Sequence, residues 1–218
     1  IAGYWSNRDF DGGTIARMTR LLAHRGPDAE GYFESGPVRF GHRRLSVIDP
    51  AGSPQPVVSA DGRVALVFNG EIYNYRALRE RLQAQGCVFS TRGDSEVLLH
   101  AWRRHGTDML EHLQGMFAFA IWDEDRRTLF VARDHLGVKP VHYAWDGETF
   151  VFASEIKAVR AHPAIGRELD LAALGLFLEC QYIPAPRTVY RDIRKLPPAH
   201  ALTVKDGELR RWRYWKPT

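Results

Sequence analysis

One ten-residue run constrains the fold of this chain more than any other, because it is apolar on both sides of a strand. The run is Gln114-Gly-Met-Phe-Ala-Phe-Ala-Ile-Trp-Asp123. Successive side chains of a strand point to opposite faces of the sheet, so both alternating sets require apolar neighbours here. The sequence therefore favours a strand packed on both faces, within two sheets that lie face to face and carry helices outside.

Further strands and helices are predicted from the spacing of apolar residues and from turn signals. The strands are predicted at residues 1–5, 38–42, 45–48, 64–68, 128–133, 141–145, 149–153, 201–204 and 209–214. The helices are predicted at residues 13–24, 75–85, 94–104 and 171–178. Strands in antiparallel runs and helices in groups indicate an α+β fold of two mainly antiparallel sheets. We expect one domain, with a core at residues 1–165 and a C-terminal extension of the same domain at residues 166–218.

The composition is that of an ordinary globular domain, with 44% hydrophobic and 26% charged side chains among 218 residues. No apolar run reaches the roughly 18 residues that a membrane helix requires, so we expect no membrane association. Arginines interleave with aromatic residues only at residues 210–216, and without a nucleic-acid motif elsewhere we expect no nucleic-acid partner. Cys87 and Cys180 are too few for a disulfide framework, which indicates a reducing compartment, the cytoplasm. Without a metal-ligand spacing among the histidines, we expect no metal site.

The motif Asn69-Gly-Glu-Ile-Tyr-Asn-Tyr75 lies where an apolar strand stops and a helical pattern begins. Asn69-Gly70 is a turn signal, and the motif presents a side-chain amide, a pliable backbone N–H and a carboxylate close together. Such groups can hold a carbonyl oxygen that becomes negative and place a charged substrate beside it. The alternative is an ordinary strand-turn-helix in which Asn69 and Gly70 serve only the turn.

Several stretches, in order and spacing, resemble the glutaminase domain of class II glutamine amidotransferases, closest to the glutamine-hydrolysing asparagine synthetases. The stretches are His24-Arg-Gly-Pro-Asp28, Gly41-His-Arg-Arg-Leu-Ser-Val-Ile-Asp49, Asn69 to Asn74, Thr91-Arg-Gly-Asp-Ser-Glu-Val97, Gln114 to Asp123, Arg133-Asp-His-Leu-Gly-Val-Lys-Pro140 and Phe152-Ala-Ser-Glu-Ile-Lys157. Lys195-Leu-Pro-Pro-Ala-His200 continues the resemblance, with Ala199 where the family usually has glycine. The resemblance covers nearly the whole chain.

This resemblance implies the αββα four-layer sandwich of N-terminal-nucleophile hydrolases. It also implies that the domain hydrolyses L-glutamine to glutamate and delivers ammonia to a synthetase domain beyond Thr218. That second domain is expected to use ATP and magnesium, whereas no cofactor is expected in this one. The acceptor of the ammonia and the oligomeric state are not given by the sequence, and a homodimer is among the states that it allows.

The resemblance also implies roles for individual residues in the binding of glutamine. Arg44 would bind the α-carboxylate, and Asp94, helped by Glu71, would bind the α-ammonium. The Asn69 side chain and the Gly70 backbone N–H would form the oxyanion hole, and the main chain at Val47 and Ile48 would line the pocket.

Each of these residues has an alternative structural role. Asp94 opens a predicted helix and can serve as its N-cap, alone or in addition to binding substrate. Arg44 belongs to an arginine pair, and only the register of the family motif selects it over Arg43. Glu71 can instead favour the positive end of the helix that follows it.

The family attacks the amide with a cysteine at the mature N-terminus, whose α-amine is the base. By the resemblance this cysteine would lie two residues before Ile1. Neither Cys87 nor Cys180 falls in a motif, and both are interpreted as small packing residues. Two explanations stay open: the chain is part of a working glutaminase, or it is a glutamine-binding or scaffold domain without the nucleophile, as in β-lactam synthetases.

Overall fold

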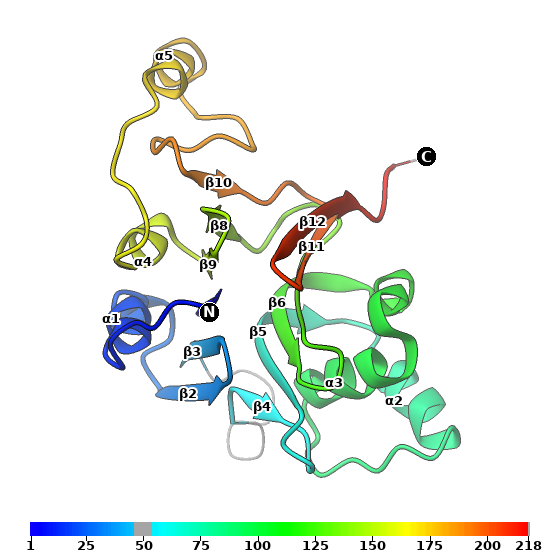
Figure 1. Ribbon diagram of the computed structural model, residues 1–218. Coiled ribbons are helices and arrows are strands. Elements are labelled where there is room, and N and C mark those ends of the chain that lie inside the picture. Colours follow the sequence, from blue (N-terminus) through cyan, green and yellow to red (C-terminus); the bar gives the residue numbers. More distant parts are fainter. Residues whose placement is uncertain (46–53, 218) are drawn as a thin grey trace.

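The computed structural model describes residues 1–45 and 54–217 (Figure 1). These residues form two six-stranded sheets in which all described strand pairs are antiparallel. The first sheet has the order β10-β8-β9-β1-β3-β2. Its strands are β1 (Ala2–Ser6), β2 (Ala29–Ser35), β3 (Val38–Arg44), β8 (His142–Trp145), β9 (Thr149–Ala153) and β10 (Ile193–Lys195).

The second sheet has the order β12-β11-β7-β6-β5-β4. Its strands are β4 (Val57–Val58), β5 (Val64–Ile72), β6 (Gly115–Asp123), β7 (Thr128–Arg133), β11 (His200–Lys205) and β12 (Glu208–Arg213). The segment after residue 165 thus adds β10 to the first sheet and β11 and β12 to the second, while the domain division at that residue stays a prediction.

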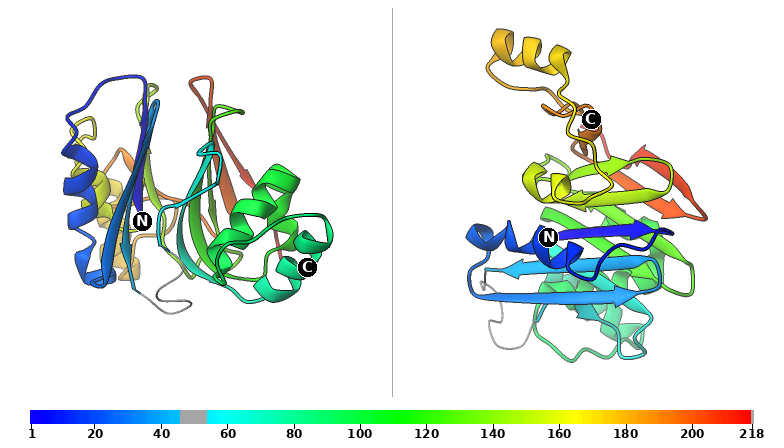
Figure 2. Two further views of the ribbon diagram at one scale, coloured as in Figure 1. Left: turned by 90° about the horizontal axis from the view of Figure 1, so that it is seen from below. Right: turned by 60° about the vertical axis from the view of Figure 1, so that its left-hand side comes forward.

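Helices cover the outer face of each sheet, so the molecule has four layers (Figure 2, left). The first sheet is covered by α1 (Thr14–Arg20) and α4 (Ile156–Arg160), and the second by α2 (Tyr75–Ala84) and α3 (Asp94–His105). Two short 3-10 helices, η1 (Ala23–Arg25) and η2 (Gly106–His112), follow α1 and α3. The predicted α+β fold of two mainly antiparallel sheets is confirmed.

Three apolar clusters fill the spaces between these layers, and β6 contributes to two of them. Phe117, Phe119 and Ile121 pack toward α2 and α3, whereas Ala118 and Trp122 pack between the sheets. Each set is buried completely or almost completely. The prediction that the strand at residues 114–123 is buried on both faces is therefore confirmed.

The largest error in the predicted elements lies at the central motif. Asn69-Gly70 is not a turn, because β5 continues through Ile72 and pairs with β6 along its whole length. Long-range pairing overrides the local turn signal. The strands β2, β4 and β10 and the helix α4 were not predicted, and the predicted strand at residues 45–48 lies almost wholly outside the described residues.

The helix α5 (Leu171–Cys180) stands away from the body of the molecule (Figures 1 and 2). Glu179 is its only charged residue and the others are apolar, yet Ala173 is its only buried residue. Cys180, at its end, is exposed, so its interpretation as a packing residue is wrong; Cys87 does pack against the cluster beneath α2 and α3. Among the described residues, no helix is long and apolar enough to cross a membrane.

Candidate functional site

A cavity of about 280 Å³ lies where the ends of β3 and β5 meet the first turn of α3. Five predicted site residues line it: Arg44, Asn69, Gly70, Glu71 and Asp94. The structure thus brings together residues that lie up to 50 positions apart in the sequence, whereas Val47 and Ile48 lie outside the described residues.

The alternation of β3 decides which of its arginines faces the space between the sheets. Val38 and Phe40 belong to the apolar cluster between the sheets, so His42 and Arg44 follow on the same face. Arg43 points the other way, where its guanidinium donates to Glu30 at 2.6 Å and to the Gly26 carbonyl at 3.0 Å. This geometry supports Arg44 rather than Arg43 as the ligand for a carboxylate, a role that stays a prediction.

The same alternation places Asn69 and Glu71 on β5. Ala65 and Val67 pack between the sheets, and Asn69 and Glu71 extend this face beyond the apolar core. The Asn69 Nδ2 atom is buried and has no hydrogen-bond partner within the described part of the chain. A buried amide without a partner costs roughly 1–3 kcal/mol, so this donor is held ready for an acceptor that enters the cavity.

The edge of β5 beyond β4 is closed by side chains instead of a strand. The pairing of β4 with β5 ends at Leu66. At Phe68, the next residue facing this edge, the N–H donates to Gln55 Oε1 at 2.8 Å and the carbonyl accepts from Gln55 Nε2 at 3.1 Å. Four residues further on, the N–H of Ile72 donates to Asp94 Oδ2 at 3.0 Å.

Gly70 lies between these two closed positions, and its N–H faces the same edge, because every second residue of a strand points its backbone groups to the same side. Within the described residues this N–H has no hydrogen-bond partner, and Gly70 lines the cavity. An N–H that is held rigidly and left open in this way is suited to bind a developing oxyanion.

Gly70 is required as a glycine for a steric reason. Its φ is +154°, and a Cβ atom here would lie 2.1 Å from the Met116 carbonyl oxygen on the paired strand β6. No side chain can shift to relieve a contact with backbone. The close approach of β5 and β6 therefore excludes any other residue at this position.

Asp94 is the first residue of α3, and Gly93 occupies the N-cap position without a side-chain cap. The Asp94 carboxylate accepts the hydrogen bond of Ile72 and is 7% exposed. Burial raises the pKa of Asp94, and the negative charge of Glu71 acts in the same direction. A cationic group that binds between these carboxylates would relieve both effects. Asp94 is therefore not the N-cap of α3, and its carboxylate joins α3 to β5 instead.

The cavity is lined by side chains of both charges. Glu71 and Asp94 come from β5 and α3, and the lining also includes the cationic residues Arg25, Arg44 and Lys139. A free amino acid, with its α-carboxylate and α-ammonium, matches this distribution. No group of three histidine, cysteine or acidic side chains suited to a metal lies together in residues 1–45 and 54–217.

Several cavity residues were not predicted as site residues from the sequence, among them His42, Gln55 and Lys139. The signal for His42 was available, since it shares the face of Phe40 and Arg44 on β3. Gln55 gave no such signal, because it reaches Phe68 only through the reversal of the chain at β4 and β5.

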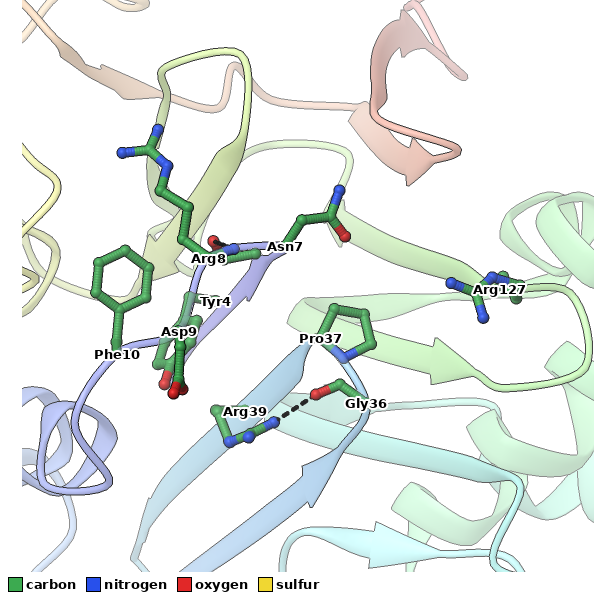
Figure 3. A pocket seen from close by; sticks show the side chains of 10 residues that line it. Tyr4, Asn7, Arg8, Asp9, Phe10, Gly36, Pro37, Arg39 and Arg127 are labelled. Carbon is green, nitrogen blue, oxygen red and sulfur yellow. Dashed lines mark hydrogen bonds between the residues drawn. The ribbon is translucent and has the colours of Figure 1, made fainter.

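A second cavity, of about 320 Å³, lies at the C-terminal end of β1 and is shown in Figure 3. It contains no predicted site residue. Its Arg39 donates to the Gly36 carbonyl at 2.7 Å, and Arg8 pairs with Asp146 at 2.6 Å. The predicted site residues line the cavity at β3, β5 and α3 instead, so we assign the function to that cavity.

Comparison with known proteins identifies the family of the chain. The family described as glutamine amidotransferase domain matches residues 1–215. The asparagine synthetase (glutamine-hydrolyzing) 3 of Bacillus subtilis is 43% identical over 205 residues, which are 93% of this chain and 33% of that protein. The chain thus spans about a third of the length of this curated relative.

Solved structures show the same fold. An allosteric regulatory enzyme of purine biosynthesis superposes with a TM-score of 0.75 at 22% identity, over 99% of this chain and 49% of that one. The glutamine phosphoribosylpyrophosphate amidotransferase of B. subtilis has a TM-score of 0.70 at 22% identity, with the same coverage of 99% and 49%. The expected αββα sandwich of the N-terminal-nucleophile type is confirmed. By its fold and by the family match over residues 1–215, the chain belongs to the class II glutamine amidotransferase domains.

Proposed function

We propose that this domain hydrolyses L-glutamine to glutamate and ammonia, and that the ammonia serves an ATP-dependent amidation of the asparagine-synthetase type. The observation that carries the proposal is a pair of donors in the cavity, Asn69 Nδ2 and the Gly70 N–H, which have no partner among the described residues and lie beside groups of opposite charge. The name of the B. subtilis relative supports the same reaction.

The charged lining sets the orientation of the substrate. Arg44 binds the α-carboxylate through its planar guanidinium, and Asp94 and Glu71 bind the α-ammonium. The side-chain amide of glutamine then points toward Asn69 and Gly70. Its carbonyl oxygen accepts from both donors, which stabilise the negative charge of the tetrahedral intermediate by roughly 3 kcal/mol per donor.

The nucleophile implied by the family is a cysteine two residues before Ile1. β1 pairs with β3 so that Ala2 lies opposite Gly41, and continuation of this register carries such a residue to the level of Arg44. The thiol sulfur attacks the amide carbon while the α-amine takes the thiol proton and passes it to the leaving nitrogen. Ammonia departs, and water hydrolyses the thioester to glutamate.

The alternative, a glutamine-binding or scaffold domain without the nucleophile, predicts glutamine binding at best and no turnover. The relative named as a glutamine-hydrolysing synthetase and the intact set of charged cavity residues favour the active domain.

The partner that we propose is a synthetase domain, which would hold ATP and magnesium. The B. subtilis relative is about three times as long as the matched segment. The helix α5 offers a surface for such a partner, because Leu171, Phe177 and Leu178 are 74%, 48% and 81% exposed. The cytoplasmic location stays a prediction.

The test uses the intact native protein, whose N-terminus is first read by mass spectrometry. We expect glutamine turnover in the wild type and roughly 10- to 100-fold weaker glutamine affinity in Arg44→Ala, since a charge-assisted pair is lost. Arg43→Ala is the matched control, because its guanidinium points to Glu30. Equal affinity in Arg44→Ala and wild type would refute the carboxylate assignment, and absence of turnover from a protein with the cysteine would refute the glutaminase.

A further inference from the structure

The Phe68 carbonyl accepts two side-chain hydrogen bonds from different parts of the fold. His42 Nε2, on β3 of the first sheet, lies 2.9 Å from this oxygen. Gln55 Nε2, in the segment before β4, lies 3.1 Å from it, and Gln55 Oε1 accepts the Phe68 N–H at 2.8 Å. Phe68 is the residue directly before Asn69, so both contacts act on the peptide that carries the first oxyanion donor.

The chemistry of these contacts fixes the state of both side chains. A carbonyl oxygen can only accept, so His42 Nε2 carries the proton and Nδ1 does not. Burial lowers the pKa of His42 to about 3, and the ring is therefore neutral at working pH. Gln55 uses both ends of its amide as a neighbouring strand would use its backbone N–H and C=O.

We propose that His42 and Gln55 are positioning residues that hold the Phe68–Asn69 peptide and thereby aim Asn69 Nδ2 and the Gly70 N–H at the substrate oxygen. This inference rests on the glutaminase function proposed above. The Asn69 N–H faces β6, at the paired residue Ala118, so the peptide between Phe68 and Asn69 is held from both sides. With Asp94 holding Ile72, the segment that carries the donors is fixed before and after Gly70.

Because the donors bind charge that appears only in the transition state, their misalignment lowers kcat and leaves KM nearly unchanged. A displacement of about 1 Å in a positioned group can cost about 100-fold in rate. We expect kcat to fall roughly 10- to 100-fold in Gln55→Leu and in His42→Phe, which keep the approximate volume of each side chain but cannot hydrogen-bond.

Conservative variants separate positioning from simple packing. His42→Gln places an amide Nε2 near the original donor, so we expect kcat within a few-fold of wild type and an unchanged pH profile. Gln55→Glu can accept the Phe68 N–H but cannot donate to the carbonyl, so we expect a loss of kcat between those of wild type and Gln55→Leu. The control is Gln83→Leu, the same exchange on the exposed surface of α2.

Hydrogen–deuterium exchange of the segment Val64–Ile72 tests, without any turnover, whether Gln55 holds the Phe68–Asn69 peptide. In Gln55→Leu the Phe68 N–H loses its acceptor, and we expect its exchange to accelerate at least 10-fold, whereas Gln83→Leu leaves it unchanged. If Gln55→Leu or His42→Phe does not fold, the kcat of Gln55→Glu decides instead, because this variant keeps the acceptor for the Phe68 N–H and loses the donor to the Phe68 carbonyl. A wild-type kcat in Gln55→Glu would overturn the inference.

The outcomes separate this inference from the glutaminase proposal. Loss of kcat at constant KM, together with faster Phe68 exchange, supports it. Wild-type kcat in folded Gln55→Leu and His42→Phe overturns it. An inactive wild type overturns the proposed glutaminase activity and with it the catalytic role of His42 and Gln55. Unchanged Phe68 exchange in Gln55→Leu shows that Gln55 does not hold the Phe68–Asn69 peptide and overturns the inference on its own.

Discussion

Asp94 Oδ2 accepts a hydrogen bond from the N–H of Ile72 at 3.0 Å, which joins the first residue of α3 to the last residue of β5. The carboxylate proposed to bind the α-ammonium is therefore attached to the strand that carries the oxyanion donors. The position of Asp94 relative to Asn69 and Gly70 is therefore set by this bond and by β5.

Asp94→Asn is expected to weaken glutamine binding and leave the fold intact. The asparagine Oδ1 can still accept the Ile72 N–H, but the charge that faces the α-ammonium is lost. We expect KM to rise roughly 10- to 100-fold, with a change in melting temperature of a few degrees at most. Kinetics and thermal unfolding are measured together. Asp94→Leu, which also loses the bond to Ile72, serves as the structural control and should melt lower; an unchanged KM in Asp94→Asn would place the ammonium elsewhere.

Gly70→Ala is expected to destabilise the domain by more than a positive φ alone explains. The added Cβ would meet the Met116 carbonyl at 2.1 Å, and β5 and β6 must separate to admit it. Gly62→Ala is the matched control, because Gly62 has a φ of +73° and no atom within 4 Å of its Cβ. We expect Gly62→Ala to cost about 1 kcal/mol and Gly70→Ala several times more, measured as free energies of unfolding. Equal costs would show that the strands separate easily at Gly70.

The sequence indicated the layers of the fold more reliably than the ends of its strands. The sequence of residues 114–123 predicts a strand buried on both faces, because both alternating sets of its side chains are apolar. The structure buries one set against α2 and α3 and the other between the sheets. Asn69-Gly70 was interpreted as a turn because local propensity favours one. Pairing with β6 prevails, and the same two residues become the strand segment that faces the cavity.

The site was predictable to the extent that it follows short motifs and strand alternation. The cavity residues Arg44, Asn69, Gly70 and Asp94 stand in such motifs, and their roles stay predictions. The preference for Arg44 over Arg43 follows from alternation with Val38 and Phe40 once β3 is extended to residue 44. The contact of Gln55 with Phe68 forms only when the chain folds back between these residues, so no local sequence pattern predicts it.

Leu178→Glu on α5 is expected to uncouple the domain from its partner. A charge in an apolar contact is unfavourable, so in the intact protein the amidation driven by glutamine should fall severalfold relative to the amidation driven by added ammonia. Leu178 is 81% exposed in the domain, so its fold should not change. The control is Val88→Glu, at a residue 84% exposed in the loop after α2. Equal effects of the two variants would mean that α5 is not the contact surface.

Lowering the pH from 7 to 4.5 is expected to destabilise the domain in part through His162. This side chain is 1% exposed, its Nε2 has no partner among the described residues, and its ring packs against Tyr4 and Phe10 at centroid distances of 4.7 and 4.5 Å. Burial lowers the pKa of His162 from 6.5 to about 4. Between these values the unfolded chain binds a proton that the folded chain does not, so this contribution to stability is complete above pH 6.5 and is lost as the pH falls toward 4. At most about 3 kcal/mol is involved.

His162→Phe isolates this contribution, because it keeps the aromatic packing and removes the titrating group. Burial also lowers the pKa of His42 to about 3 and that of His142 to about 4, so the variant retains part of the acid sensitivity. We expect the free energy of unfolding, measured with urea at pH 7 and pH 4.5, to fall by roughly 1–3 kcal/mol less in His162→Phe than in the wild type. Parallel losses in the two proteins would mean that His162 takes up its proton in the folded state, which its enclosure by Tyr4 and Phe10 opposes.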